Sequence, residues 1–122
     1  MTDEPTEISS APNEWSPVDG GATLGQEGSE GGVIVRDDEH PLGARATLER
    51  GGFAPWSITC GLYGWMVHTI FFRERAEAEA AMEVVEAELA AILEAISAAD
   101  DDAPERIDAV VAMIGAFVDR HR

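Results

Sequence analysis

Alternation of apolar and polar side chains with a period of two residues is the feature that most constrains this sequence. In ARATLER, residues 44–50, the apolar side chains occupy even positions, and the same parity continues through WSITCGLYGWMVHTIFF, residues 56–72. A period of two is typical of half-buried strands, and one strand over all of 56–72 would be far longer than usual. The sequence therefore predicts strands at about 44–50, 56–62 and 66–72, with Tyr63 and Gly64 in a hairpin turn.

The same parity predicts the register of these strands, because a slip of one residue would turn every side chain to the opposite face. Pairing Leu62 with Met66 keeps the even positions together and places Cys60 opposite His68. The even face is then apolar except for His68. The odd face is mixed, able to meet water or another chain, and carries Arg45, Thr47, Glu49, Ser57, Thr59, Val67, Thr69 and Phe71.

The residues before this meander predict one more strand and a tail. Val33, Ile34 and Val35 are a short β-branched run, which indicates a strand at about 33–36, and DDEHPLG then resembles a turn. In that turn Asp37, Asp38, Glu39 and His40 suggest a cation site, but four successive residues of regular structure do not face one ion. We expect a solvated turn there and no metal site.

Residues 1–32 are rich in Gly, Ser, Pro, Asp and Glu and contain few large apolar side chains. Such a composition buries too little surface to offset the entropy of ordering, so we expect a flexible acidic tail. Trp15 is the exception, and it either folds back onto the domain or anchors a partner.

Two helices are predicted after the strands. Apolar side chains at helical spacing run through about 74–97, and a second apolar stripe runs through about 103–120. Asp102 and Glu105 have the form of a capping box around Pro104. The predicted fold class is α+β: a three- to four-stranded antiparallel β-meander covered on one face by two antiparallel C-terminal helices. Residues 33–122 form its single domain, and residues 1–32 its tail.

Composition limits the classes of partner. The formal net charge is -16, with 24 acidic residues against 8 basic residues. Such a charge repels phosphate backbones and anionic lipids, so we expect no nucleic-acid or membrane binding. One Cys, no signal-peptide pattern and no apolar run long enough to span a bilayer predict a cytoplasmic protein. No motif for a cofactor or metal ion is present.

Cys60 and His68 are the candidate catalytic residues. If they are cross-strand neighbours, an imidazole beside a thiol can stabilise the thiolate and activate it as a nucleophile. The alternative is a purely structural role, because both side chains point toward the predicted core, where Cys acts as a small apolar residue.

A candidate binding surface combines large aromatic residues around the turns with the odd face of the last strand: Trp56, Tyr63, Trp65, Val67, Thr69 and Phe71. We therefore interpret the chain as a small acidic, non-enzymatic protein-interaction domain, such as an adaptor, inhibitor or immunity-type protein, which self-associates as a homodimer. The alternative is a ligand-binding or catalytic domain that uses Cys60 and His68 in a pocket between sheet and helices.

Overall fold

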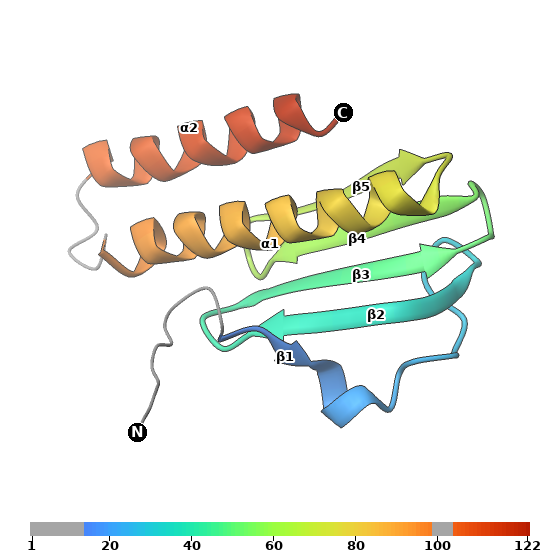
Figure 1. Cartoon of the computed structure of the whole chain (residues 1–122). Helices are drawn as coiled ribbons and strands as arrows, with labels where there is room; N and C mark the ends of the chain where they lie inside the picture. Colours follow the sequence, from blue (N-terminus) through green and yellow to red (C-terminus); the bar gives the residue numbers. More distant parts are fainter. Residues whose placement is uncertain (1–13, 99–103) are drawn as a thin grey trace, which may run out of the picture.

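The computed structural model describes residues 14–98 and 104–122, which form a five-stranded sheet with two helices on one face (Figure 1). The strands pair antiparallel in sequence order: β1 (Ser16–Pro17), β2 (Val33–His40), β3 (Ala44–Arg50), β4 (Trp56–Leu62) and β5 (Met66–Phe72). The helices are α1 (Arg75–Ala98) and α2 (Pro104–Arg120). The predicted α+β fold is confirmed, and β1 is an additional short strand.

The register predicted from parity is confirmed in β3, β4 and β5. Leu62 pairs with Met66, and Cys60 pairs with His68. Thr47, Thr59 and Thr69 form a row across the three strands on the odd face. Alternation excludes slips of one residue, because these would turn the apolar side chains away from the core, and the short turn between Leu62 and Met66 selects this register among the rest.

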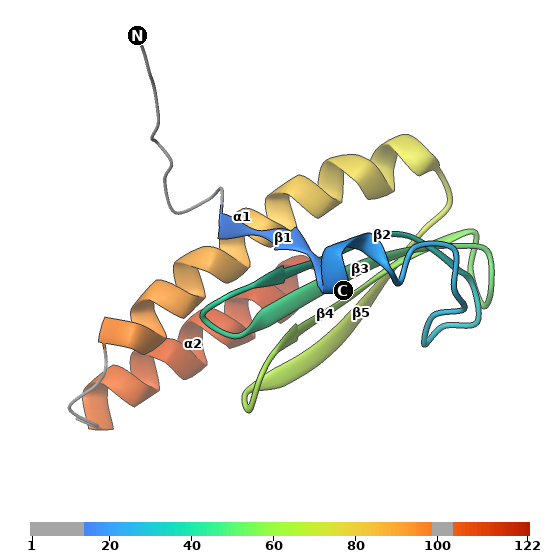
Figure 2. The same ribbon diagram turned by 90° about the horizontal axis from the view of Figure 1, so that it is seen from below.

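The even face of the sheet, called here the inner face, packs under α1. Figures 1 and 2 show α1 and α2 lying side by side, with α1 crossing the sheet. Phe117 of α2 is fully buried and joins the same core cluster. The other fully or almost fully buried apolar residues of this cluster include Ala44, Ala46, Leu48, Ile58, Leu62, Met82, Val85 and Leu89. Neither helix of the described residues is long and apolar enough to cross a membrane.

The first predicted strand is longer than expected. β2 continues to His40, so the prediction of a turn at residues 37–40 is wrong. Asp37 pairs with Thr47 and lies on the outer face, while Asp38 pairs with Ala46 on the inner face. Alternation sends the four polar side chains to opposite faces of the sheet. A strand can hold Asp37 and Asp38 because basic and hydroxyl side chains form ion pairs and hydrogen bonds with them.

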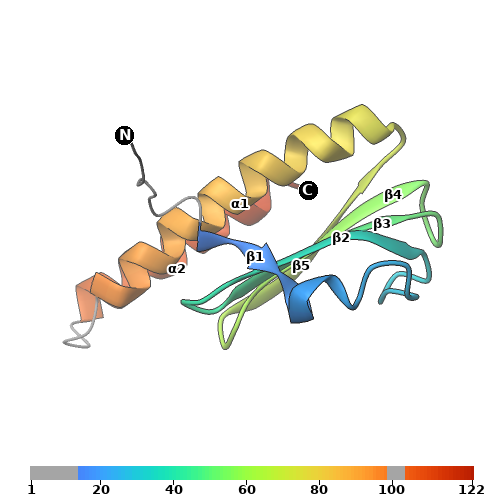
Figure 3. The ribbon, with the colours of Figure 1, turned by 60° about the horizontal axis from the view of Figure 1, so that its bottom comes forward.

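Residues 14–32, called here the strap, were predicted to belong to a flexible tail, but they form defined structure against the sheet. Trp15 packs on the inner-face core, with its ring 5.3 Å from that of His40. β1 then pairs with the edge of β2, and a 3-10 turn at Val18–Gly21 follows. Figure 3 shows this turn, in blue, on the opposite side of the sheet from α1. The expected domain boundary at residue 32 therefore falls within ordered structure.

The predicted helix limits agree with α1 and α2 to within one residue. Pro104 and Glu105 occupy the first turn of α2, as the capping pattern requires. Asp102, the other member of the predicted capping box, lies outside the described residues.

Candidate functional site

The candidate pair Cys60 and His68 is adjacent in register, but the thiol and the imidazole each form a hydrogen bond with a backbone oxygen. The Cys60 thiol is fully buried and donates to the backbone carbonyl of His68, with a Sγ to O distance of 3.2 Å. Burial raises the pKa of this thiol to about 12. Because the thiolate is the nucleophilic form, this environment suits a structural thiol.

The His68 imidazole bonds to a different group. Its Nε2 lies 2.7 Å from the backbone oxygen of His121, and its ring approaches Phe117 edge-on. His121 Nε2 lies in turn 2.6 Å from Glu88 Oε1. His68 therefore links β5 to the C-terminal end of α2, and Glu88 extends this link to α1.

A buried carboxylate organises the outer face at Asp37. Arg45 donates to it from Nε at 3.0 Å and from Nη2 at 2.6 Å, and the hydroxyls of Thr47 and Thr23 each donate at 2.8 Å. Burial alone would raise the pKa of Asp37, but these hydrogen bonds outweigh it and hold the pKa below its ordinary value. Asp37 thereby joins β2, β3 and the strap.

Glu49 is a second buried carboxylate on the outer face. The backbone amide of Glu30 donates to its Oε1 at 3.2 Å, and that of Gly32 donates at 3.1 Å. Gly28 lies so close that a Cβ there would overlap the carboxylate. The glycine-rich run GSEGG, residues 28–32, is thus a loop of backbone donors folded around Glu49.

Sequence reasoning missed both carboxylates. Two features of the sequence pointed to Glu49. It is an acidic residue inside a strongly alternating strand, and the glycine-rich run at residues 28–32 is longer than a turn needs. For Asp37 the signal was weaker. Its partners Thr23, Arg45 and Thr47 are separated from it in sequence and form no recognisable pattern with it.

A groove of about 810 Å³ lies on the outer face between the strap and the strands. Its floor includes Thr47, Thr59 and Gly61. One wall comes from the strap. The opposite wall holds three of the predicted binding residues, Tyr63, Trp65 and Val67. This groove is therefore on the face opposite to the sheet–helix interface where a pocket was expected.

The other predicted binding residues lie elsewhere. Thr69 and Phe71 continue along the outer face of β5, where the ring of Phe71 lies 5.3 Å from that of Phe53. Trp56 is half-buried, packs against the inner-face core and lies under the Arg75 guanidinium. The structure thus brings together Tyr63, Trp65 and Val67 and leaves Trp56 on the other face.

The exposed side chains in the outer row of β5 are apolar: Val67 is 79% exposed and Phe71 46%, with the half-buried Thr69 between them. Trp65, in the turn before β5, is 40% exposed. β5 is the last strand of the sheet, so its far edge pairs with no strand of the described residues. The stretch from residue 56 to 72 also contains no Asp, Glu, Lys or Arg.

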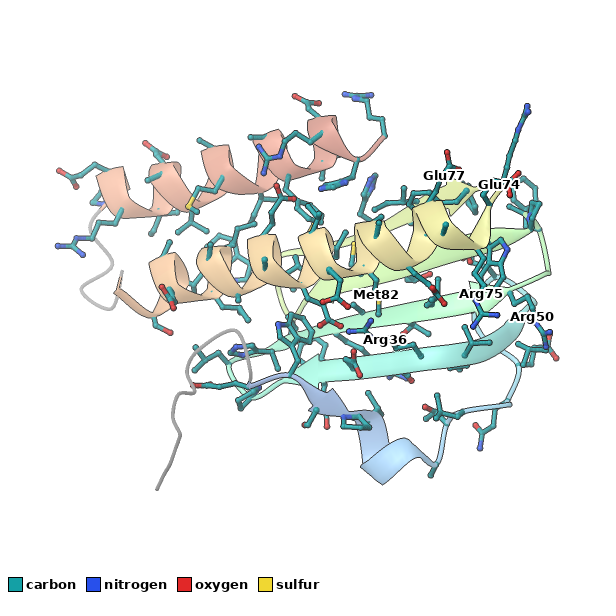
Figure 4. All side chains as sticks on the ribbon, in the orientation of Figure 1. Arg36, Arg50, Glu74, Arg75, Glu77 and Met82 are labelled. Atoms are coloured by element: carbon teal, nitrogen blue, oxygen red, sulfur yellow. The ribbon has the colours of Figure 1, made fainter. Side chains whose placement is uncertain are left out.

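A charged cluster joins β2 to α1 near the inner face. Arg36 contacts Asp38 at 2.8 Å, Glu83 at 2.8 Å and Glu86 at 3.3 Å. Figure 4 shows Arg36 between β2 and α1. Burial, together with the nearby Asp38, raises the pKa of Glu86 to about 8. The cluster is a contact between elements rather than a cleft.

No protein-family model, curated protein or solved structure matches the chain. Within residues 14–98 and 104–122, no group of three or more His, Cys, Asp or Glu is placed to hold a metal ion.

Proposed function

We propose that this protein is a non-enzymatic interaction domain that self-associates through the edge and outer face of β5. The observation that carries the proposal is the exposed apolar row of an edge strand without a charged side chain. Natural sheets usually protect their edges with charges, prolines, short strands or covering segments. In a chain with a net charge of -16, an edge strand without charged side chains is unusual. Its absence of charge is expected if a strand of a second copy covers this edge.

The opposite edge supports this argument. There the final strand, β1, has two residues, and one of them is Pro17. Beside it, β2 carries Arg36, Asp38 and Glu39. A short strand, a proline and charges are the usual protections against pairing, so this edge is closed to a second chain.

The sequence of β5 is self-complementary in an antiparallel pair. A two-fold axis at Thr69 places Val67 of one copy opposite Phe71 of the second copy, and Thr69 opposite itself. Each exposed apolar side chain then meets another, and no like charges face each other. The pair would extend the sheet across both copies.

Net charge opposes this association and makes it depend on salt concentration. Two chains of charge -16 repel each other, and most of α1's glutamates are exposed. Salt screens repulsion between exposed charges. Self-association should therefore strengthen as the salt concentration rises, in contrast to binding driven by opposite charges.

Sedimentation equilibrium over a range of protein concentrations and at two salt concentrations tests the proposal. The unaltered chain is expected to dimerise, and Val67→Lys and Phe71→Lys are expected to be monomeric. Val111→Lys is the matched control, because Val111 is 54% exposed on α2. A strict monomer at every concentration, or loss of the dimer in Val111→Lys, would contradict the proposal.

A further inference from the structure

We propose that the groove between the strap and the outer face is a binding site for a small, neutral, flat aromatic molecule that carries a carbonyl or similar hydrogen-bond acceptor. This site is separate from the self-association surface, although Val67 borders both.

The groove has the dimensions and lining of a small-molecule site. Its volume of about 810 Å³ lies within the range of roughly 300–1,000 Å³ that is typical of such sites. Tyr63 and Trp65 offer aromatic surface on one wall, and Thr47, Thr59 and Arg45 are polar residues of the floor. Mostly apolar walls with a few polar groups are the usual composition of ligand pockets.

Gly61 leaves the floor of the groove open. It lies within β4, where glycine weakens a strand and often marks the close approach of another molecule. A Cβ at Gly61 would come no closer than 3.6 Å to Met66 O and 3.9 Å to Val67 Cγ2. Packing within the chain therefore does not require glycine here, whereas an occupant lying flat on the strand would.

The charges around the floor favour a neutral ligand. Arg45 is a cation of the floor, and Asp37 already neutralises it through Nε and Nη2. An anion would gain little from a compensated guanidinium and would be repelled by a chain of charge -16. Glu27 is the carboxylate that lines the groove, and it is exposed, so it offers a cation only a weak contact that solvent screens. Among the described residues, Arg45 Nη1 has no hydrogen-bond partner, so it is a donor for a carbonyl oxygen.

The strap completes the site, because Thr23 both lines the groove and bonds to Asp37. Gln26 and Glu27 lie on the same wall. The Gly28–Gly32 loop that holds Glu49 keeps this wall in place. The two buried carboxylates thus hold the wall opposite Tyr63 and Trp65.

A fluorescence titration with Nile red, a neutral planar dye with a carbonyl group, tests the site. The full chain is expected to bind the dye at one site per chain, and coumarin, which is also neutral and flat, should displace it. The anionic dye 1-anilinonaphthalene-8-sulfonate is expected to bind at least about tenfold more weakly, a difference of about 1.4 kcal/mol.

Gly61→Ile is the diagnostic variant, because it fills the floor while favouring the strand conformation. We expect Nile red affinity to fall about tenfold or more with no loss of thermal stability. Gly115→Ile is the control, since the space around Gly115 on α2 is open. Trp65→Ser, on the wall, should also weaken binding. Unchanged affinity in Gly61→Ile would overturn the proposal.

One further variant separates this site from self-association. Phe71 does not line the groove, so Phe71→Lys should lose the dimer and bind Nile red as the unaltered chain does. If Phe71→Lys loses dye binding, or if dye binding falls as the dimer forms, the groove is not an independent ligand site and the inference is overturned.

Discussion

The two faces of the sheet are held together by different physical means. On the inner face Ala46, Leu48 and Ile58 are buried against helices, and their own side chains carry no polar group to satisfy. On the outer face the buried groups include two carboxylates, Asp37 and Glu49, which hydrogen bonds join to the strap. The inner face depends on apolar area, which is non-directional, and the outer face depends on a few directed contacts.

This difference indicates where the protein tolerates change and where it contacts other molecules. The inner face can be repacked with side chains of similar volume. The outer face is closed over β2 and β3 by the strap, but it remains open along the groove and β5. The working surfaces proposed above both lie on this less completely covered face.

The largest expected effect comes from Glu49 and its neighbour Leu48, which lie on opposite faces of β3. Glu49→Ala leaves the buried amides of Glu30 and Gly32 without acceptors and should lower the free energy of unfolding by about 3 kcal/mol. Leu48→Ala should cost about as much, roughly 2–5 kcal/mol. Limited proteolysis distinguishes them, since only Glu49→Ala should expose residues 14–32 to cleavage while the rest of the fold persists. Equal protection of the strap in both variants would contradict the comparison.

A smaller effect is expected at Gly28. A Cβ there overlaps the Glu49 carboxylate, so Gly28→Ala should lower the free energy of unfolding by about 1–3 kcal/mol, as overpacking does. Gly61→Ala is the matched control and should leave it within about 0.5 kcal/mol. Chemical denaturation measures both, and equal stability of the two variants would show that the loop is not packed on Glu49.

The two faces should also respond to pH in opposite directions. The raised pKa of Glu86, about 8 against an ordinary 4.5, means that the unfolded chain loses this proton first as pH rises. The free energy of unfolding therefore falls as the pH rises from about 4.5 to 8. Glu86→Gln should flatten this part of the plot of stability against pH. The lowered pKa of Asp37 contributes stability that is lost below its ordinary value of 3.8. Denaturation of Glu86→Gln and Asp37→Asn across pH measures both slopes, and an unchanged slope in either variant contradicts its assignment.

The smallest effect is expected at Cys60. With its thiol buried and its pKa raised, alkylation by iodoacetamide should proceed only as fast as the chain unfolds. Rapid labelling of the native protein would restore Cys60 and His68 as a reactive pair.

Much of the inner face could be predicted from the sequence, and little of the outer face. Alternation placed Cys60 opposite His68 and Thr59 opposite Thr69, because a period of two reports directly which side of a strand is buried. Alternation did not predict the strap, since Glu30 and Gly32 contact Glu49 through backbone amides rather than through apolar side chains. Asp37 resembled a turn residue because its partners, Thr23 and Arg45, are brought to it only by the tertiary fold.

The candidate site was predicted in part. Tyr63, Trp65 and Val67 were selected as aromatic or exposed residues and do line one groove, whereas parity itself places Trp56 on the inner face. The position of the groove depended on the strap, so it followed from no local pattern. The side-chain partners of Cys60 and His68 were also beyond prediction, because register fixes neighbouring positions but not the direction of a hydrogen bond.

Hydrogen exchange in β5 as a function of protein concentration tests the central claim, that the open edge of the outer face is where the chain meets a second copy. The β5 amides that do not bond to β4 should exchange rapidly in dilute solution and become protected as concentration rises, with the effect centred on Thr69. Exchange at these amides that stays rapid at every concentration would contradict the claim.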